Sequence, residues 1–317
     1  MNTKRIISLA ASLALVLSLS VGLTGCGDKT AQDDNQGEPA ADSAKYTVGV
    51  CQLVQHDALD AATQGFIDAL NEALPGQVEI VTKNASGDSA NCSTIVNGFV
   101  SDNVDLIMAN ATPALTAAAA ATKDIPILGT SITAYGVALD IDDFNGTVGG
   151  NISGTSDLAD LEAQADMITE WFPEAKKVGL LFCSAEPNSL YQVEEVAKYL
   201  SAKGIESQQF AFTDTNDVAS VTQSAADYAD VIYVPTDNTA ASNTEAIANV
   251  LVPAGVPAIC GEEGICKGCG VATLSISYYD LGVTTGKMAA KILTGEADIS
   301  EMPIEFTEAT PKYNASM

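Results

Sequence analysis

The sequence predicts an α/β protein with two doubly wound lobes, each built on a mostly parallel sheet. Three observations support this prediction. Short runs rich in β-branched residues alternate with amphipathic stretches from Tyr46 onward, this alternation restarts after a glycine-rich segment at 146–154, and polar residues cluster directly after the apolar runs. Strands that alternate with helices form parallel sheets with helices on both faces. The 317 residues suit two lobes of roughly 100–150 residues each.

In the first half of the chain, expected strands and helices follow one another in a regular order. An apolar face at helical spacing, as formed by Leu59, Phe66 and Leu70, indicates a helix, whereas short β-branched runs between turn signals indicate strands. The expected strands lie at 47–53, 78–82, 104–109 and 126–129, and the expected helices at 58–74, 94–100 and 113–122.

The second half repeats the order. The expected helices lie at 158–172, 189–202, 218–226, 245–251 and 278–293, and the expected strands at 177–182, 205–212, 231–235 and 258–260. We expect an N-terminal lobe of residues 46–152 plus 276–300 and a C-terminal lobe of residues 153–275 plus 301–317, with the first crossing in the glycine-rich connection near 150–155.

The N-terminal segment predicts secretion. Lys4 and Arg5 precede an apolar run at 6–19 that is short for a membrane span. The junction 23–26 (Leu-Thr-Gly-Cys) resembles the lipobox of bacterial lipoproteins. This resemblance implies that residues 1–25 are a signal peptide and that Cys26 is diacylated and becomes the N-terminus. An ordinary signal peptide with an incidental cysteine is the alternative.

Residues 26–45 form the expected tether. From Gly27 to Lys45 the chain has no large apolar side chain, so this segment cannot bury enough apolar surface to fold. We therefore expect a folded protein that begins at Tyr46, lies outside the cytoplasm and is anchored to the cell membrane through its lipid only.

The charge balance excludes several functions. Acidic residues number 41 against 14 basic ones, a net charge of −27, which repels phosphate backbones and excludes nucleic-acid binding. Arg5 is the only arginine and His56 the only histidine. After cleavage no guanidinium remains, so hydroxyls, amides, backbone N–H groups or lysine must hold any anionic ligand group. We expect no cofactor and no metal.

The cysteines and the missing catalytic motifs argue against an enzyme. Apart from the lipidation site the chain has Cys51, Cys92, Cys183, Cys260, Cys266 and Cys269. The last two have the C-x-x-C spacing of a redox pair or half a zinc site, so a metal site, a local disulfide and free thiols all stay open. No G-x-S-x-G, G-x-x-x-x-G-K-[ST] or G-x-G-x-x-G motif occurs. We expect no catalytic activity.

Polar residues follow five of the expected strands. These clusters are at 55–57, 110–112, 130–133, 184–189 and 236–239. Ligands of open α/β sheets bind beyond the carboxyl ends of the strands, where such residues converge. Helix capping is the alternative explanation for many of them singly. Together they predict a small-molecule site between the lobes.

Four segments together resemble one family. They are 56–61 (His-Asp-Ala-Leu-Asp-Ala), 184–189 (Ser-Ala-Glu-Pro-Asn-Ser), 233–239 (Tyr-Val-Pro-Thr-Asp-Asn-Thr) and 278–282 (Tyr-Tyr-Asp-Leu-Gly). They resemble ABC-transporter substrate-binding lipoproteins of the tryptophan/tyrosine (aromatic amino acid) uptake type, over about 46–295. The resemblance implies a type I periplasmic-binding-protein fold, in which two Rossmann-like lobes joined by three hinge strands close on a ligand. It also implies a membrane permease and a cytoplasmic ATPase as partners.

Carried over residue by residue, the resemblance implies a set of ligand contacts. These are His56, Leu59, Thr112, Ser131, Thr133, Ser156, Asp157, Ser184, Asn188, Asp237 and Asn238. Relatives usually read Thr-Asp-Pro where this chain has Thr133-Ala134-Tyr135, so Tyr135 joins Leu59 as an expected contact for a ligand ring.

The expected ligand is a small amino acid, aromatic (Trp, Tyr or Phe), delivered to the permease. An aliphatic amino acid, a short peptide, a sensing lipoprotein without transport, and an adhesive or purely interacting protein are the alternatives. We expect hydroxyls and helix N-termini to hold the ligand carboxylate, and Asp237 to be the counter-ion of its ammonium group. A pure helix cap is the alternative role of Asp237.

Overall fold

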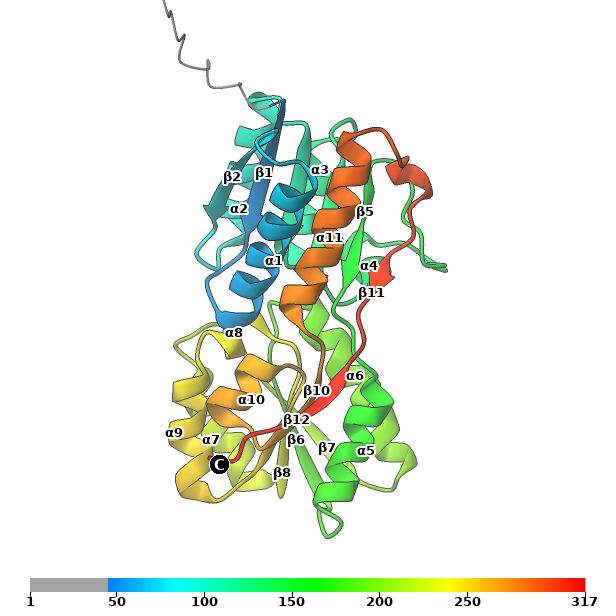
Figure 1. The fold of residues 1–317 in the computed structure, drawn as a ribbon. Coiled ribbons are helices and arrows are strands. Elements are labelled where there is room, and N and C mark those ends of the chain that lie inside the picture. Colours follow the sequence, from blue (N-terminus) through cyan, green and yellow to red (C-terminus); the bar gives the residue numbers. More distant parts are fainter. Residues whose placement is uncertain (1–44, 317) are drawn as a thin grey trace, which may run out of the picture. The chain divides into compact units, whose positions relative to one another are not determined.

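The computed structural model describes residues 45–316, which fold into two six-stranded sheets with helices packed on both faces (Figure 1). The expected signal peptide (1–25) and all of the expected tether (26–45) except Lys45 lie outside the described residues. Within the described part, no helix has the length and apolarity needed to cross a membrane.

The first sheet is parallel throughout and has the strand order β11-β5-β4-β3-β1-β2. Its strands are β1 (Tyr46–Gln52), β2 (Val78–Asn84), β3 (Leu106–Asn110), β4 (Ile127–Ile132), β5 (Ile152–Ser156) and β11 (Glu305–Phe306). The elements beside it are α1 (Asp57–Ala73), α2 (Ser89–Ser101), α3 (Thr112–Ala121), α4 (Tyr135–Leu139), α11 (Tyr278–Leu293) and the short 3-10 helix η1 (Ile299–Glu301). The central strands β3 and β4 are buried along their whole length, as strands covered on both faces should be.

The second sheet has the order β12-β10-β9-β8-β6-β7, and only β12 runs antiparallel to its neighbour. Its strands are β6 (Lys177–Cys183), β7 (Glu206–Phe212), β8 (Val231–Val234), β9 (Ala258–Cys260), β10 (Ala272–Ser275) and β12 (Thr310–Tyr313). Its helices are α5 (Leu161–Trp171), α6 (Pro187–Ala202), α7 (Val218–Tyr228), α8 (Asn238–Ala241), α9 (Thr244–Ala254) and α10 (Glu263–Cys269).

Three segments connect the two sheets: 157–160 after β5, 276–277 after β10, and 307–309 after β11. The lobe boundaries differ from the sequence-based division. Backbone pairing places β5 in the first sheet, so the first crossing follows Ser156 rather than residue 152. The same pairing places β11 in the first sheet, although 301–317 was expected in the C-terminal lobe. A two-residue strand is too short to show its sheet in the sequence.

Helices α1 and α11 lie side by side against the first sheet although they are far apart in sequence (Figure 1). Glycines permit the close approach. A Cβ on Gly65 would lie 2.1 Å from the Tyr279 carbonyl oxygen, and one on Gly282 would lie 2.0 Å from the Ala62 carbonyl oxygen. This packing brings the start of each helix to the same end of the sheet, where His56 and Tyr278 contribute to one cavity.

Most long elements agree with the sequence-based expectations to within a few residues, whereas several short ones were not expected. Helices α4, α8 and α10 and the strands β5, β10, β11 and β12 have seven residues or fewer. Such lengths show little periodicity. The expected helix at 158–172 begins only at Leu161, because the Asp160 carboxylate accepts the Ala163 N–H as a cap.

Candidate ligand-binding site

A small cavity lies beyond the carboxyl ends of the strands, with walls from both sheets. Its volume is about 10 Å³, room for roughly one water molecule. The residues that line it are His56, Leu59, Ser131, Thr133, Asp157, Asn188, Thr236, Asp237, Asn238, Ala241, Glu262 and Tyr278. A neighbouring pocket of about 400 Å³ shares His56, Ala241 and Glu262 with it. Because the central cavity is so small, the two lobes must separate before a larger ligand can enter.

Eight of the eleven residues expected from the sequence line this cavity. The other three are not among the lining residues. Thr112 begins α3, the Ser156 hydroxyl donates to the Thr133 carbonyl oxygen at 3.0 Å, and the Ser184 hydroxyl donates to the Phe212 carbonyl oxygen at 3.2 Å. Thr236 belongs to the polar cluster expected at 236–239 but was not among the expected contacts, whereas sequence reasoning missed Ala241, Glu262 and Tyr278 altogether. Glu262 lies between the short elements β9 and α10, and its position after β9 was the available signal, whereas Tyr278 begins the long helix α11.

Tyr135 does not face the cavity, so the expectation of a ring contact there is wrong. Its side chain is 2% exposed, stacks on Phe144 and donates its hydroxyl hydrogen to the Thr155 carbonyl oxygen at 3.1 Å. The phenol fills the core of the first lobe beside β4 and β5, where its hydroxyl needs a buried acceptor. Leu59, the other expected ring contact, does line the cavity.

A bulge in β4 turns Ser131 toward the cavity. The pairing of β4 with β5 shifts register between Gly129 and Ile132, and Ser131 has φ +56°, a left-handed conformation that is uncommon outside glycine. Its Oγ is buried and has no hydrogen-bond partner. Unpartnered buried hydroxyls are costly, and strain of this kind is concentrated at functional sites. Ser131 Oγ is therefore a buried hydroxyl that is free to form a hydrogen bond with a ligand.

Asp157 stands at the first crossing and is held by two hydroxyls. Thr133 Oγ1 donates to its Oδ1 at 3.1 Å, and Tyr278 OH donates to its Oδ2 at 2.9 Å. Tyr278 begins α11 directly after the second crossing. Burial raises the pKa of Asp157 above its ordinary value, while these two hydrogen bonds oppose the shift.

Asp237 is fully buried and caps the short helix α8. Its Oδ1 accepts the Ala240 N–H and its Oδ2 accepts the Cys183 N–H, both at 2.7 Å. Burial raises its pKa to about 8, and the nearby Glu186 carboxylate contributes to this shift. Asp237 thus has the capping role that was the alternative to a counter-ion, and it also lines the cavity, as a counter-ion must.

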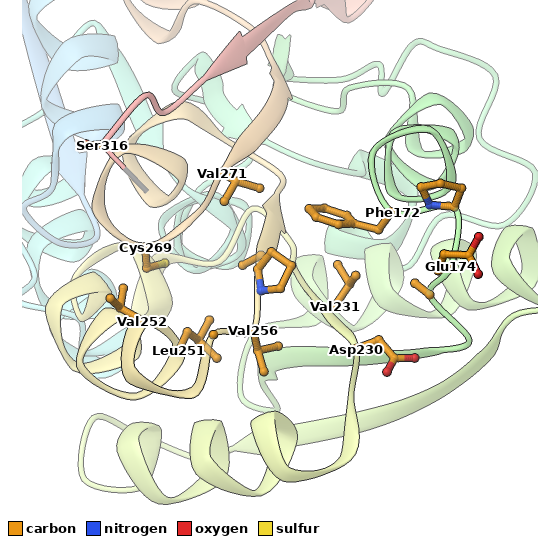
Figure 2. A pocket seen from close by; sticks show the side chains of 15 residues that line it. Phe172, Glu174, Asp230, Val231, Leu251, Val252, Val256, Cys269, Val271 and Ser316 are labelled. Carbon is orange, nitrogen blue, oxygen red and sulfur yellow. The ribbon is translucent and has the colours of Figure 1, made fainter.

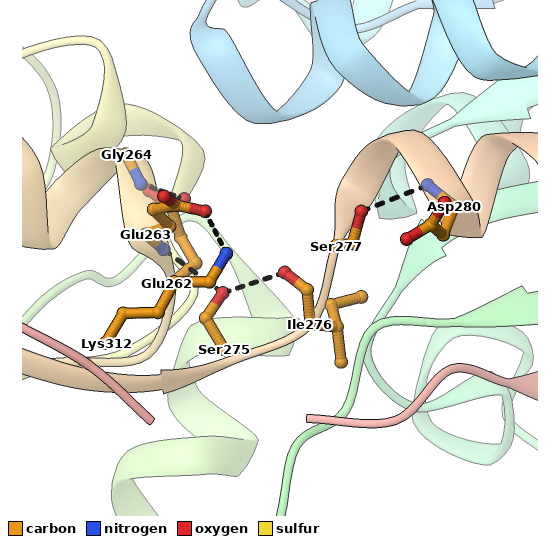
Figure 3. Close-up of polar contacts among 8 residues, drawn as sticks. All are labelled: Glu262, Glu263, Gly264, Ser275, Ile276, Ser277, Asp280 and Lys312. Atoms are coloured by element: carbon orange, nitrogen blue, oxygen red, sulfur yellow. Dashed lines mark hydrogen bonds and ion pairs between the residues drawn. The ribbon is translucent and has the colours of Figure 1, made fainter. Parts of the chain in front are cut away.

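Glu262 is the third buried acid that lines the cavity, after Asp157 and Asp237. It caps α10, with Oε2 accepting the Gly264 N–H at 2.6 Å and Oε1 the Ile265 N–H at 2.5 Å. The Glu263 N–H donates to Ser275 Oγ at 3.2 Å, which ties α10 to the crossing that follows β10 (Figure 3). Burial raises the pKa of Glu262 to about 7.

The cavity is lined by acidic side chains that have no lysine or arginine beside them in the lining. Asp157, Asp237 and Glu262 are each 5% exposed or less, and no lysine or arginine is among the lining residues. Neither do the ion pairs found within 45–316 involve any of the three. Each of the three accepts hydrogen bonds, but none has a positive partner among the described residues, and burial without one disfavours the charged form of a carboxyl group. The arrangement is therefore suited to a ligand that supplies a positive charge.

Three contacts join the lobes around the cavity. His56 Nε2 lies 3.3 Å from Asn238 Oδ1, Gln192 Nε2 donates to Thr133 Oγ1 at 3.5 Å, and Lys267 Nζ lies 3.5 Å from Asp57 Oδ2. The first two are buried or partly buried, whereas the ion pair is largely exposed and contributes little. These contacts show that the two lobes are closed on each other.

A larger pocket, of about 770 Å³, lies at the other end of the second sheet (Figure 2). Val231 and Ala258, the first residues of β8 and β9, line it, together with the apolar side chains of Phe172, Leu251 and Val256. No buried polar side chain converges on it as at the cleft. The amino ends of parallel strands are also not where α/β sheets bind ligands.

The thiols take no part in the cleft. Within the described residues all six cysteines are free and buried, and no group of three or more potential metal ligands occurs. None of these six lines the cavity between the lobes.

Two doubly wound lobes, three connections and a polar cavity between the sheets define a type I periplasmic binding fold. The family model described as "ABC transporter substrate binding protein" matches residues 47–310. The chain belongs to this family, and it acts as the solute-binding component of an ABC importer outside the cytoplasm. The family is one of binding proteins rather than enzymes.

The relatives include proteins that bind aromatic amino acids. A tyrosine-binding protein of Clostridioides difficile (strain R20291) is 33% identical over 98% of this chain and 89% of its own length. The ABC domain of a Streptococcus pneumonia protein, solved in complex with L-Trp, is 32% identical, with a TM-score of 0.82 over 86% of this chain and 93% of its own.

Comparison with a third relative indicates that the lobes of this structure are closed. The ligand-free, open structure of a substrate binding protein with adhesive properties from Clostridium difficile is 34% identical, with a TM-score of 0.66 over 86% of this chain and 92% of its own. At almost equal identity, the present structure is thus more similar to the L-Trp complex than to the open form. This agrees with the contacts that join the lobes.

Proposed function

We propose that the protein captures an aromatic L-amino acid between its lobes and presents it to the permease. The observation that carries this proposal is the group of three buried carboxyl groups, Asp157, Asp237 and Glu262, around one cavity whose lining has no lysine or arginine. An α-ammonium group is the positive charge that an amino acid brings. In a site from which water is excluded, it offsets the cost of ionising these acids.

The ligand carboxylate meets donors on the wall of the first lobe. Ser131 Oγ is the unpartnered buried hydroxyl there. The first turn of α1 begins at the cavity, and its N-cap residue His56 makes no side-chain cap to the helix. The N–H groups of this turn and the positive end of the helix dipole favour an anion without any arginine, although Asp57 and Asp60 in the same turn act against it. By contrast, the protein's own carboxylates already cap α8 and α10.

The ligand's side chain packs against Leu59 and Ala241 and extends toward the pocket shared with His56 and Glu262. The aromatic class is supported by the tyrosine-binding relative and by the relative in complex with L-Trp. An aliphatic amino acid or a short peptide is the second candidate for the same site, since the neighbouring pocket of about 400 Å³ would also take a longer chain.

The same proposal covers anchoring. We infer from the junction at 23–26 that Cys26 is diacylated and holds the protein at the membrane beside a permease and an ATPase. Mass spectrometry of the mature N-terminus tests it. A diacylated Cys26 supports anchoring, and an unmodified mature N-terminus at another residue contradicts it.

A thermal-shift screen of the twenty L-amino acids, followed by calorimetry, tests the proposed ligand class. At a ligand concentration one hundred times Kd the free energy of unfolding rises by about 2.7 kcal/mol. We expect L-Trp, L-Tyr or L-Phe to give the largest shift, and the corresponding deaminated acids, such as 3-phenylpropionate, to give little. No shift with any amino acid would contradict the proposal, and a larger shift with Leu or Ile would favour the second candidate.

A further inference from the structure

The buried carboxylate of Glu186 holds two loops of the second lobe together. Glu186 is the N-cap of α6, is 5% exposed, and accepts hydrogen bonds from five donors. Its Oε1 accepts from Thr239 N at 2.8 Å and from Thr239 Oγ1 at 2.8 Å. Its Oε2 accepts from Asn238 N at 2.9 Å, Asn238 Nδ2 at 2.7 Å and Asn188 Nδ2 at 3.2 Å. Both side-chain amides that it contacts belong to residues lining the cavity.

These bonds determine which end of each amide faces the cavity. Asn188 Nδ2 also donates to the Thr236 carbonyl oxygen at 3.1 Å, so its nitrogen is surrounded by acceptors. Turning the amide over would place Oδ1 against the Glu186 carboxylate and that carbonyl, oxygen against oxygen. Asn188 Oδ1 is thereby left as the free end, and it is buried without any hydrogen-bond partner.

Glu186 fixes the orientation of the Asn238 side-chain amide in the same way. Its nitrogen is fixed on Glu186, so its Oδ1 is the atom that meets His56 Nε2 across the cleft. One carboxylate therefore presents two amide carbonyl oxygens to the space between the lobes. Both are hydrogen-bond acceptors, and one of them has no donor.

We propose that Glu186 is a positioning residue that sets the hydrogen-bonding polarity of this wall, so that Asn188 accepts a hydrogen bond from the ligand's ammonium group. The inference rests on the proposed function and adds a residue that selects for the ammonium. Glu186 acts through Asn188 and is not itself among the residues lining the central cavity. A cap alone, through Asn238 N and Thr239 N, is the competing explanation of the same contacts.

The variant Glu186→Gln separates the two explanations. Gln keeps the size and one acceptor oxygen, but its amide nitrogen must find an acceptor. Asn188 supplies one by turning over, at the cost of its own hydrogen bond to the Thr236 carbonyl oxygen. Asn188 Nδ2, a hydrogen-bond donor, then faces the ligand's ammonium group, which is also a donor. We expect the calorimetric Kd for the best aromatic L-amino acid to rise about tenfold or more, and the Kd for its deaminated analogue to stay within about threefold, because only the ammonium contact is lost. A loss of capping alone would weaken both ligands equally.

A second substitution should restore the preference for the amino acid over its deaminated analogue. In Glu186→Gln/Asn188→Asp, one Asp oxygen accepts from the Gln nitrogen and the other faces the cavity as an acceptor whichever way the group turns. The hydrogen bond to the Thr236 carbonyl oxygen is lost here as in the single variant, so the two variants differ in the atom that faces the cavity and not in that bond. We expect the preference for the amino acid over its deaminated analogue to return, which repair of a helix cap would not produce. Glu194→Gln is the matched control, since Glu194 is exposed on the same helix and should leave both Kd values unchanged.

The outcomes are distinct. No binding of any amino acid by the natural protein would overturn the proposed function and this inference together. Normal binding with an unchanged preference in Glu186→Gln would overturn the inference alone. If that variant does not fold, as judged by its melting curve, NMR of the natural protein decides. The Asn188 side-chain NH2 protons should exchange slowly with solvent, and rapid exchange would overturn the inference.

Discussion

His56 Nε2 lies 3.3 Å from Asn238 Oδ1, so the first residue before α1 meets the first residue of α8 across the cleft. Because the Asn238 nitrogen is held by Glu186, Oδ1 is the acceptor and His56 must donate from Nε2. A neutral imidazole protonated on Nε2 suffices for this bond. The two lobes are thus joined at the cavity by a hydrogen bond that depends on one histidine.

The pKa of His56 reports directly on closure. Burial lowers this pKa from its ordinary value, although the hydrogen bond to Asn238 and the carboxylates of Glu186, Asp60 and Asp57 act against the shift. His56 is the only histidine in the chain, so a single imidazole signal titrates in NMR. We expect its pKa to lie below that of the unfolded chain when ligand is bound. A pKa above that reference would contradict the closed geometry.

Removing the hydrogen bond across the cleft should weaken ligand binding. In His56→Ala the Asn238 oxygen loses its donor, and a neutral hydrogen bond contributes about 0.5–1.5 kcal/mol, so we expect the calorimetric Kd to rise about two- to tenfold. His56→Gln retains an N–H donor and serves as the control, with a smaller rise. Equal Kd values for His56→Ala and the natural protein would show that the contact does not contribute to closure.

Substitution of Ser131 should lower the affinity for the ligand without lowering the stability of the protein. Glycine adopts φ +56° without strain, so Ser131→Gly should leave the melting temperature unchanged or raise it. It also removes the unpartnered Oγ, so the affinity for the amino acid should fall about fivefold or more, in keeping with a charge-assisted hydrogen bond to the ligand carboxylate. Unchanged affinity in this variant would exclude Ser131 as a ligand donor.

Asp237→Asn separates the counter-ion from the helix cap. Loss of a charge partner in a desolvated site costs about 2–5 kcal/mol, which corresponds to about thirty- to several-thousand-fold in Kd. Asn is about as good a cap as Asp for the Ala240 N–H, although it no longer offers a second oxygen to the Cys183 N–H. Calorimetry on the folded variant decides, and a Kd within threefold of the natural protein's would retire Asp237 as counter-ion in favour of Asp157.

The stability of the ligand-free protein should depend on pH through the buried acids. In the folded state Asp237, with a pKa of about 8, and Glu262, with a pKa of about 7, stay protonated at pH values where the unfolded chain has lost these protons. The folded state then binds more protons, so the free energy of unfolding falls as pH rises from about 4 to about 8. We expect Asp237→Asn to flatten the melting temperature against pH, and parallel curves for the two proteins would contradict these pKa values.

The sequence predicted the long elements and most of the cavity wall for one reason. Buried parallel strands are continuous apolar runs, and the polar residues after them, such as Asn188 and Asp237, must converge at one edge. Tyr135 could not be assigned in this way, because a tyrosine beside a strand end faces either the ligand or the core. Its burial against β5 depends on a pairing across the sheet that local pattern does not contain.

The local sequence pattern could not show the role of Glu186 either. Its partners Asn238 and Thr239 are 52 and 53 residues away and come from a separate loop. Glu262 reads in the sequence as one of two adjacent acids after a short strand, and only the start of α10 shows that it turns inward while Glu263 pairs with Lys312 at the surface (Figure 3). Tertiary contacts of this kind decide which polar residues line a site.

The most direct test of the proposed ammonium site is the number of protons released when L-Trp or L-Tyr binds at pH 7. It is measured by calorimetry in two buffers of different ionisation enthalpy. An ammonium group placed among Asp157, Asp237 and Glu262 lowers the raised pKa values of these acids, so we expect net release of protons on binding, and a smaller release in Asp237→Asn. Tight binding with no proton release, or with proton uptake, would contradict the proposed site.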